Sequence, residues 1–210
     1  MKAAIFDADG TILDSMPIWQ ELGDRYLAQR GVRPEPGLGD ILYPMSLEEG
    51  CAYLKRRYGL PESPAEIGKG VEEILAAFYR AEVPLKPGAG DYLQRLHERG
   101  IPMLIATSSR REPLQWAFQR LGIDGFFREI LTCQELHTTK RDPDIYLEGA
   151  RRLGTKPEDT AVFEDVLYGI LAAKRAGFET YAIEDDTNLQ DRAALHKEAD
   201  HYIRNFKELL

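Results

Sequence analysis

The chain has 210 residues, of which 43% are hydrophobic and 30% are charged, as in an ordinary soluble globular protein. This length suits one core domain that carries a smaller inserted module. The net charge of -8 argues against nucleic acid as a partner, because a phosphate backbone requires a basic surface. It argues equally against an anionic membrane, since no polybasic cluster offsets the charge.

The two cysteines and the start of the chain indicate a cytoplasmic protein. No apolar stretch approaches membrane-spanning length, and the N-terminus lacks the charged and then apolar pattern of a signal peptide. Cys51 and Cys133 lie far apart and do not have the spacing of a metal-binding pair. We therefore expect reduced thiols in the cytoplasm.

Short apolar runs alternate with helical patterns along most of the chain. Strands are expected at residues 3–6, 103–106, 129–133, 160–163, 180–183 and 201–206. Helices are expected at about 88–99, at 112–121, from an N-cap at Asp142 to Gly154, and at 168–177. Because these strands are continuously apolar rather than alternating, we expect an α/β fold, a doubly wound parallel sheet with helices on both faces.

Residues 15–84 break this alternation, because they contain only helical signals. SLEE (46–49) and SPAE (63–66) both have capping-box spacing, a serine followed three residues later by a glutamate. Joints rich in proline and glycine separate the helical patterns. The sequence therefore predicts an all-helical domain at 15–84, inserted into a core domain of residues 1–14 and 85–210.

Polar side chains follow four of the expected strands. They are Asp7, Ala8, Asp9, Gly10 and Thr11 after the first strand, Thr107 and Ser108 after the second, Lys140 beyond the third, and Glu164 and Asp165 after the fourth. In an open parallel sheet, ligands bind outside the carboxyl ends of the strands. These groups are therefore expected to converge on one edge of the sheet.

Such a set of side chains suits phosphoryl transfer. Mg²⁺ prefers carboxylate oxygens from more than one segment, which Asp7 and Asp165 supply, with Glu164 beside or behind Asp165. A carboxylate can act as a nucleophile and form an aspartyl-phosphate. A second acid two residues further on, here Asp9, can protonate the leaving oxygen and then take a proton from water. Hydroxyl and ammonium groups bind the oxygens on which charge develops.

Four segments carry a family resemblance. FDADGT resembles the DxDGT signature of the haloacid dehalogenase (HAD) superfamily, and LIATSS, KRDPDIY and VFEDVLYGILAAKRAG resemble its second, third and fourth motifs, in the family's order. The resemblance implies a Rossmann-like core, and the helical insert resembles the C1 cap of the subgroup that contains phosphoglycolate-type phosphatases and β-phosphoglucomutase. Two positions depart from the family pattern, with Arg141 in place of the usual proline and Val166 in place of a frequent serine.

The resemblance also implies a role for each matched residue. Asp7 would be the nucleophile and a Mg²⁺ ligand, and Asp9 would be the general acid and base, with its backbone carbonyl also on Mg²⁺. Thr107 would bind the transferring phosphate and Lys140 would neutralise it. The remaining assignments are a metal site completed by Glu164 and Asp165, and phosphate contacts from Ala8, Gly10, Thr11 and Ser108. Whether Glu164 contacts the metal directly or stands behind it is left open.

The expected function is a Mg²⁺-dependent phosphatase of a small phosphorylated metabolite, with the cap closing over the substrate. The enzyme is expected to be a monomer or weak dimer. A β-phosphoglucomutase-like mutase is the alternative, because it shares every core residue named. Mutases commonly carry a histidine early in the first cap helix, where this chain has Trp19-Gln20. This difference favours hydrolysis.

Three further functions rank below these two. Dehalogenation needs no acid at position 9. A receiver-type signalling domain also gathers acids, a threonine and a lysine at a sheet edge, but it is smaller, has no helical insert and carries its phosphorylated aspartate in mid-chain. A non-catalytic phosphate-binding protein would not need every reactive group that is present here.

Overall fold

The computed structural model describes all residues, 1–210. The chain folds into two compact units, each of which has most of its contacts within itself. The first, which we call the α/β unit, contains Met1–Ser15 and Val83–Leu210, and the second, the helical unit, contains Met16–Glu82. The chain thus leaves the α/β unit after a single strand and supplies the other five strands after the helical unit.

The α/β unit is built on one sheet in which each neighbouring pair of strands is parallel. The strands are β1 (Ala3–Phe6), β2 (Met103–Thr107), β3 (Phe127–Thr132), β4 (Thr160–Glu164), β5 (Glu179–Ile183) and β6 (His201–Ile203). Their order across the sheet is β3-β2-β1-β4-β5-β6. The winding direction therefore reverses between β1 and β4, which is where such sheets bind ligands. The predicted fold class, a doubly wound Rossmann-like sheet, is confirmed.

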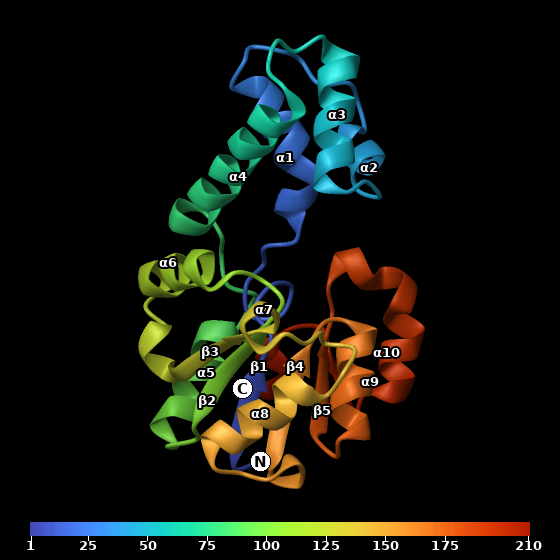
Figure 1. Ribbon diagram of the computed structural model, residues 1–210. Helices are drawn as coiled ribbons and strands as arrows, with labels where there is room; N and C mark the ends of the chain where they lie inside the picture. Colours follow the sequence, from blue (N-terminus) through green and yellow to red (C-terminus); the bar gives the residue numbers. More distant parts are fainter. The chain divides into compact units, whose positions relative to one another are not determined.

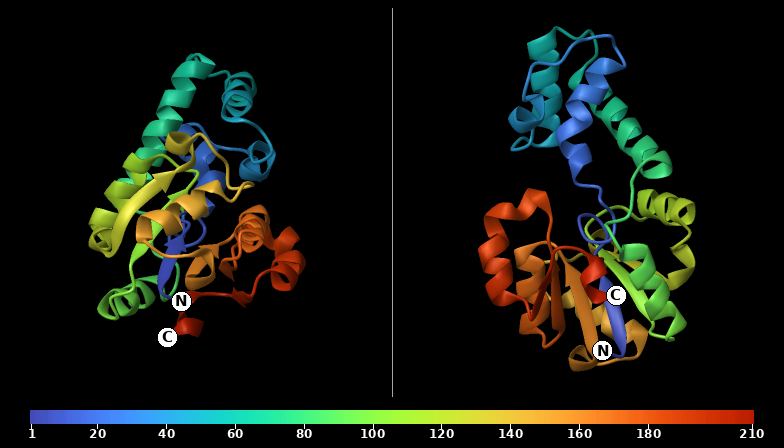
Figure 2. Two further views of the ribbon diagram at one scale, coloured as in Figure 1. Left: turned by 60° about the horizontal axis from the view of Figure 1, so that its bottom comes forward. Right: turned by 180° about the vertical axis from the view of Figure 1, so that it is seen from behind.

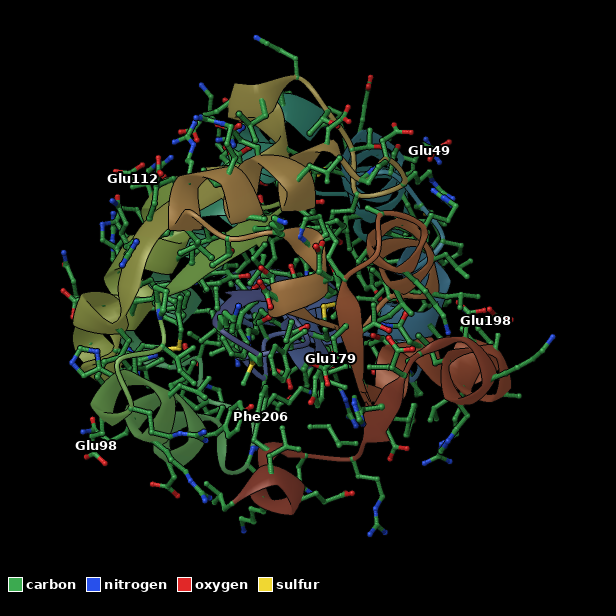
Figure 3. The ribbon with its side chains drawn as sticks, turned by 90° about the horizontal axis from the view of Figure 1, so that it is seen from below. Glu49, Glu98, Glu112, Glu179, Glu198 and Phe206 are labelled. Atoms are coloured by element: carbon green, nitrogen blue, oxygen red, sulfur yellow. The ribbon has the colours of Figure 1, made fainter.

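Helices cover both faces of this sheet. They are α5 (Ala89–Glu98), α6 (Arg111–Leu121), α7 (Cys133–Leu136), α8 (Asp144–Leu153), α9 (Leu167–Arg175) and α10 (Arg192–Glu198). Helices α8 and α9 lie in front of the sheet in Figure 1, and the view from behind in Figure 2 shows α5 on the opposite face. Figure 3 shows Glu98, Glu112 and Glu198, which belong to α5, α6 and α10, at the periphery of the unit.

The two faces of β1 have different packing partners. Ala3 and Ile5 belong to an aliphatic cluster with buried side chains of α8 and α9. Phe6 points to the other face, where its ring stacks on Phe163 at 4.4 Å between centroids and lies 6.4 Å from the ring of Phe206. All four residues of β1 are fully buried. The strand is therefore anchored on both sides, and the segment that follows it starts from a fixed position.

The helical unit consists of α1 (Pro17–Ala28), α2 (Leu38–Leu42), α3 (Leu47–Tyr58) and α4 (Pro64–Ala81). Both predicted capping boxes are confirmed, since Ser46 with Glu49 and Ser63 with Glu66 exchange the side-chain to backbone hydrogen bonds of that motif. No helix in either unit is both long enough and apolar enough to cross a membrane.

Several expected boundaries differ from the structure. The strand expected at 129–133 is β3 at Phe127–Thr132, and Cys133 begins α7 instead. Helix α8 has Pro143 at its N-cap rather than Asp142, whose carboxylate instead accepts a hydrogen bond from Thr139 at 3.4 Å. The last strand ends at Ile203 instead of continuing to residue 206. Phe206 begins a short 3-10 helix, because its ring packs into the aromatic layer behind the sheet. Helices α2, α7 and α10 are too short to give a clear helical period in the sequence.

Candidate active site

The loop after β1 places two carboxylates at the carboxyl edge of the sheet. The amide of Asp7 donates to the carbonyl of Phe163 on β4 at 2.9 Å, which fixes the start of the loop. The amides of Ile12 and Leu13 both donate back to the carbonyl of Ala8, at 3.0 and 2.8 Å. Gly10 has a φ of 81° within this turn, a conformation that strains residues with a side chain. The DxDG pattern is thus a compact turn beside β4.

Three carboxylates and one ammonium group form a buried cluster at this edge. Ligand oxygens of Asp7, Glu164 and Asp165 all lie within 4.8 Å of one another. Lys140, from the segment between α7 and α8, donates to both Asp7 Oδ1 and Glu164 Oε1. All four side chains are buried. The structure therefore brings together four residues that lie up to 158 positions apart in the sequence. They meet at the edge of the sheet where the ends of the strands led us to expect them.

The cluster contains more negative than positive charge. Burial raises the pKa of Asp7 to about 7, and the neighbouring Glu164 adds to this rise, while the Lys140 ammonium opposes it. Burial, together with the charges of Asp7 and Glu164, raises the pKa of Asp165 well above its usual range. A divalent cation among these oxygens would supply the missing positive charge, and oxygen-only ligands suit a hard cation such as Mg²⁺. The residues present therefore fit the expected metal.

Glu164 uses all of its acceptor positions within the protein. Its Oε1 accepts from Lys140 and from the Tyr146 hydroxyl, the latter at 2.9 Å. Its Oε2 accepts from the backbone amides of Asp165 and Val166, at 3.1 and 3.3 Å. An ionised carboxylate has about four lone-pair sites, so these bonds occupy the group completely. In this arrangement Glu164 orients the Lys140 ammonium and the start of the β4–α9 turn.

Asp9 has quite different surroundings from Asp7. Its Oδ1 accepts a hydrogen bond from Ser15 at 2.7 Å, and its Oδ2 accepts one from Ser109 at 2.6 Å. The side chain is half-buried and its carboxylate is not one of the three clustered groups. Asp9 is thus held by two neutral hydroxyl groups beside the cluster.

The segment after β2 contributes a serine that the sequence analysis did not select. Ser109 rather than Ser108 reaches Asp9, whereas the Ser108 hydroxyl lies 3.6 Å from the sulfur of Cys133. The Thr107 hydroxyl accepts from the amide of Ser109 at 3.0 Å, which turns the chain so that Ser109 faces the loop after β1. The run of hydroxyl residues was the only available signal, and it did not indicate which serine points towards Asp9.

Asp165 is held from two sides by neutral donors. The Thr11 hydroxyl, expected to contact phosphate, is fully buried and donates to Asp165 Oδ1 at 3.3 Å. The Asn188 side chain donates to Asp165 Oδ2 at 2.7 Å and to its backbone carbonyl at 3.3 Å. No motif in the sequence points to Asn188, because it lies in the turn after β5, beyond the last of the four matched segments.

The departure from the family pattern at position 141 does not affect this cluster. The Arg141 guanidinium lies 4.7 Å from the centre of the Tyr168 ring, and its backbone carbonyl accepts from Arg175 at 2.8 Å. These contacts attach the segment after Lys140 to α9. The neighbouring lysine keeps its place in the cluster with an arginine where a proline is usual.

Comparison with known proteins agrees with these features. Residues 1–177 match the family model described as haloacid dehalogenase-like hydrolase. The chain is 30% identical over 180 residues to phosphorylated carbohydrates phosphatase of Thermotoga maritima, which covers 85% of this chain and 83% of that protein. It is 28% identical over 191 residues to hexitol phosphatase A of Escherichia coli, covering 87% of this chain and 82% of the relative.

A solved structure resembles the whole chain. It is a Thermotoga maritima protein provisionally assigned as a beta-phosphoglucomutase, with a TM-score of 0.86, 28% identity and full coverage of both chains. The relatives named as phosphatases and the family match agree with the buried acid and lysine cluster. The chain therefore belongs to the haloacid dehalogenase-like hydrolases and is a phosphoric monoester hydrolase of that superfamily.

Proposed function

We propose that this hydrolase is a Mg²⁺-dependent phosphatase of small phosphorylated metabolites that works through an aspartyl-phosphate on Asp7. The observation that supports this most is the buried cluster of three carboxylates around a single lysine at the carboxyl edge of the sheet. The relatives named as phosphatases of phosphorylated carbohydrates and of hexitol phosphates favour a polyol or sugar phosphate as the substrate class.

In the first half of the reaction, a carboxylate oxygen of Asp7 attacks the phosphorus atom. The bond between phosphorus and the leaving oxygen breaks, and Asp9 gives that oxygen a proton. In the second half, Asp9 takes a proton from water, which attacks the same phosphorus. Inorganic phosphate leaves and the Asp7 carboxylate is restored. The hydrogen bonds from Ser15 and Ser109 hold Asp9 in position for both proton transfers.

The groups around Asp7 would stabilise the charge that develops on the phosphate. Lys140 already contacts Asp7, and the buried Thr107 hydroxyl can donate a hydrogen bond while its oxygen accepts from Ser109. Ala8, Gly10 and Ser108 remain predicted phosphate contacts. The metal would be held by Asp7, Asp165 and the backbone carbonyl of Asp9. Glu164 lies in the same cluster and would stand behind the metal, because its oxygens already accept four hydrogen bonds within the protein. When bound, Mg²⁺ supplies positive charge for the phosphate oxygens.

We further propose that the helical unit serves as a C1-type cap domain that selects the leaving group, with domains of residues 1–14 and 85–210 and of residues 15–84. The enzyme would act in the cytoplasm as a monomer or weak dimer, without nucleic acid or membrane partners. The net charge of -8 supports the absence of such polyanionic partners.

A phosphosugar mutase is the second candidate function. It is favoured by the likeness of the whole fold to the provisionally assigned beta-phosphoglucomutase. A mutase shares the same first half-reaction, but it returns the phosphate to a sugar hydroxyl instead of to water. Trp19-Gln20 at the start of α1, where mutases commonly have a histidine, supports hydrolysis.

A panel of phosphorylated metabolites tests the proposal directly. Sugar phosphates, polyol phosphates and phosphoglycolate are incubated with the enzyme and Mg²⁺, and phosphate release is measured with and without EDTA. We expect release from at least one class and none in EDTA. In parallel, β-glucose 1-phosphate is supplied with glucose 1,6-bisphosphate. Glucose 6-phosphate formed without free phosphate would overturn the phosphatase assignment in favour of a mutase.

A further inference from the structure

The turn after β5 supplies a hydrogen-bond donor to the metal-site acid at the end of β4. Strand β5 pairs with β4 in parallel, with Ala182 beside Glu164. The segments that leave these two strands therefore run next to each other. Asn188 lies in the 3-10 segment Asp186–Asp191 and interrupts its helical geometry, with φ at -110° and ψ at 18°. This local break accompanies the contact of its side chain with Asp165.

Asn188 and Thr11 share the two oxygens of Asp165. The amide nitrogen of Asn188 lies 2.7 Å from Oδ2 and the Thr11 hydroxyl lies 3.3 Å from Oδ1. Both donors are neutral, so they orient the carboxylate without neutralising it. The Lys140 ammonium, by contrast, donates to Asp7 and Glu164. The direction of the Asp165 carboxylate is thus fixed by two hydrogen bonds, without an ammonium partner of its own.

A buried ion pair holds the turn that carries Asn188. Asp185 accepts from the backbone amide of Thr187 at 2.9 Å, which shapes the start of the turn. Lys86 donates to the other Asp185 oxygen at 2.6 Å, and both side chains are buried. The amide of Lys86 in turn donates to the carbonyl of Ile12, in the loop after β1, at 2.8 Å. The Asn188 turn is therefore tied to the same loop that presents Asp7 and Asp9.

We propose that Asn188 is a positioning residue for the metal site, which orients Asp165 so that its carboxylate binds Mg²⁺. This inference rests on the Mg²⁺ site of the proposed function. Groups that hydrogen-bond a ligating carboxylate typically change metal affinity by about 10- to 100-fold when they are removed. Val166, which follows Asp165, has an aliphatic side chain and cannot donate a hydrogen bond. Asn188 supplies such a bond from a different segment of the chain.

Calorimetric titration of Mg²⁺ into the substrate-free protein separates this role from a general effect on activity. Asn188→Leu keeps a similar side-chain volume and removes the donor, while Asn188→Ala also removes the volume. We expect both variants to bind Mg²⁺ about 10- to 100-fold more weakly than the wild type. Phosphatase kcat should recover towards the wild-type value at saturating Mg²⁺, because the reacting groups are intact. Leu189→Ala is the control, since that neighbouring side chain is about half exposed, and it should leave the affinity unchanged.

The outcomes distinguish this inference from the proposed function. If the wild type binds Mg²⁺ and Asn188→Leu binds it equally well, the role of Asn188 is overturned while the phosphatase proposal stands. If Asn188→Leu retains wild-type affinity and only Asn188→Ala loses it, side-chain volume rather than the hydrogen bond matters, and the inference also fails. If the wild type itself shows no Mg²⁺ binding, both the inference and the metal site are overturned.

Discussion

Two aspartates that are separated by one residue have distinct physical surroundings in this protein. Asp7 is buried against the Lys140 ammonium, whereas Asp9 is half-buried and held by two serine hydroxyls. The sequence predicted that both acids follow the first strand, because the apolar run and the glycine turn define their positions, whereas their roles in the reaction stay predictions. It did not predict Ser109 or Asn188, because the direction of a loop side chain depends on contacts that are distant in sequence.

The variant Ser109→Ala tests whether the hydrogen bond from Ser109 holds the Asp9 carboxylate in position. The substitution removes one of the two hydroxyl donors to the Asp9 carboxylate, a hydrogen bond to a charged group worth about 1.5 kcal/mol or more. We expect kcat to fall roughly 10-fold or more, with Mg²⁺ affinity unchanged, because Asp9 is no longer held in place for proton transfer. Steady-state kinetics measures the effect.

Gln115→Ala is the matched control, because that side chain is exposed on α6, the helix that follows Ser109. It should leave kcat unchanged. A wild-type kcat in Ser109→Ala would show that Ser15 alone is sufficient to hold Asp9, and would contradict the role given to this contact.

Most of the helices and strands were predictable from the periodicity of apolar residues and from the capping, glycine and proline residues at their ends. The continuous apolar runs located every strand of the sheet, and the serine and glutamate spacing located the starts of α3 and α4. The exact ends were less predictable where tertiary packing competes with local preference, as at Phe206, which leaves the strand for the aromatic layer. Close approaches between elements, such as that of α9 to β4, left no pattern in the sequence.

Gly169→Ala tests the approach of α9 to the site. A methyl group at position 169 would lie 2.8 Å from the Tyr146 hydroxyl oxygen and 2.9 Å from the Glu164 carboxylate carbon. Both groups are buried and hydrogen-bonded to each other, so they cannot move freely. We expect the free energy of unfolding to fall by about 1–3 kcal/mol despite the better helix propensity of alanine, and kcat to fall as Glu164 and Lys140 shift.

Urea denaturation and kinetics of the same protein provide the two measurements. Gly125→Ala is the control, since no atom lies within 4 Å of the added methyl group, and its effect should stay within about 0.5 kcal/mol. An equal or greater stability of Gly169→Ala, with wild-type kcat, would show that α9 can move away from the site without consequence.

The molecule as a whole gathers more carboxylates than ammonium groups at one buried site, where we propose that a cation binds. Buried carboxylates without enough positive charge reduce the stability of the metal-free protein, since desolvation disfavours their ionised forms. The doubly wound fold class was predictable, because continuously apolar strands alternate with helical patterns, whereas the strand order came from the structure. The balance of charge was less predictable, because it depends on burial and on distances of a few ångströms.

Asp165→Asn tests this charge balance. The substitution removes a buried acid whose ionised form is disfavoured by desolvation and by the neighbouring carboxylates, so we expect the Tm of the metal-free protein to rise. Wild-type protein should gain stability on adding Mg²⁺, by about 2.7 kcal/mol at 100 times the dissociation constant, and the variant should lose most of this gain. Thermal denaturation with Mg²⁺ or EDTA measures both effects. The exposed Asp91→Asn on α5 should retain the full Mg²⁺ response. A lower metal-free Tm in Asp165→Asn, with an intact Mg²⁺ response, would contradict the proposed metal site.

Trapping the phosphorylated enzyme tests most directly whether Asp7 is the nucleophile. A substrate identified in the metabolite panel is mixed with enzyme and Mg²⁺, the reaction is stopped with acid during turnover, and the protein is reduced with borohydride. Reduction of an aspartyl-phosphate gives homoserine, which mass spectrometry locates in the N-terminal peptide. We predict homoserine at position 7 in the wild type, and none when Mg²⁺ is absent or in Asp7→Asn. Phosphate release with position 7 unmodified, or with the modification at another residue, would contradict the central role of Asp7.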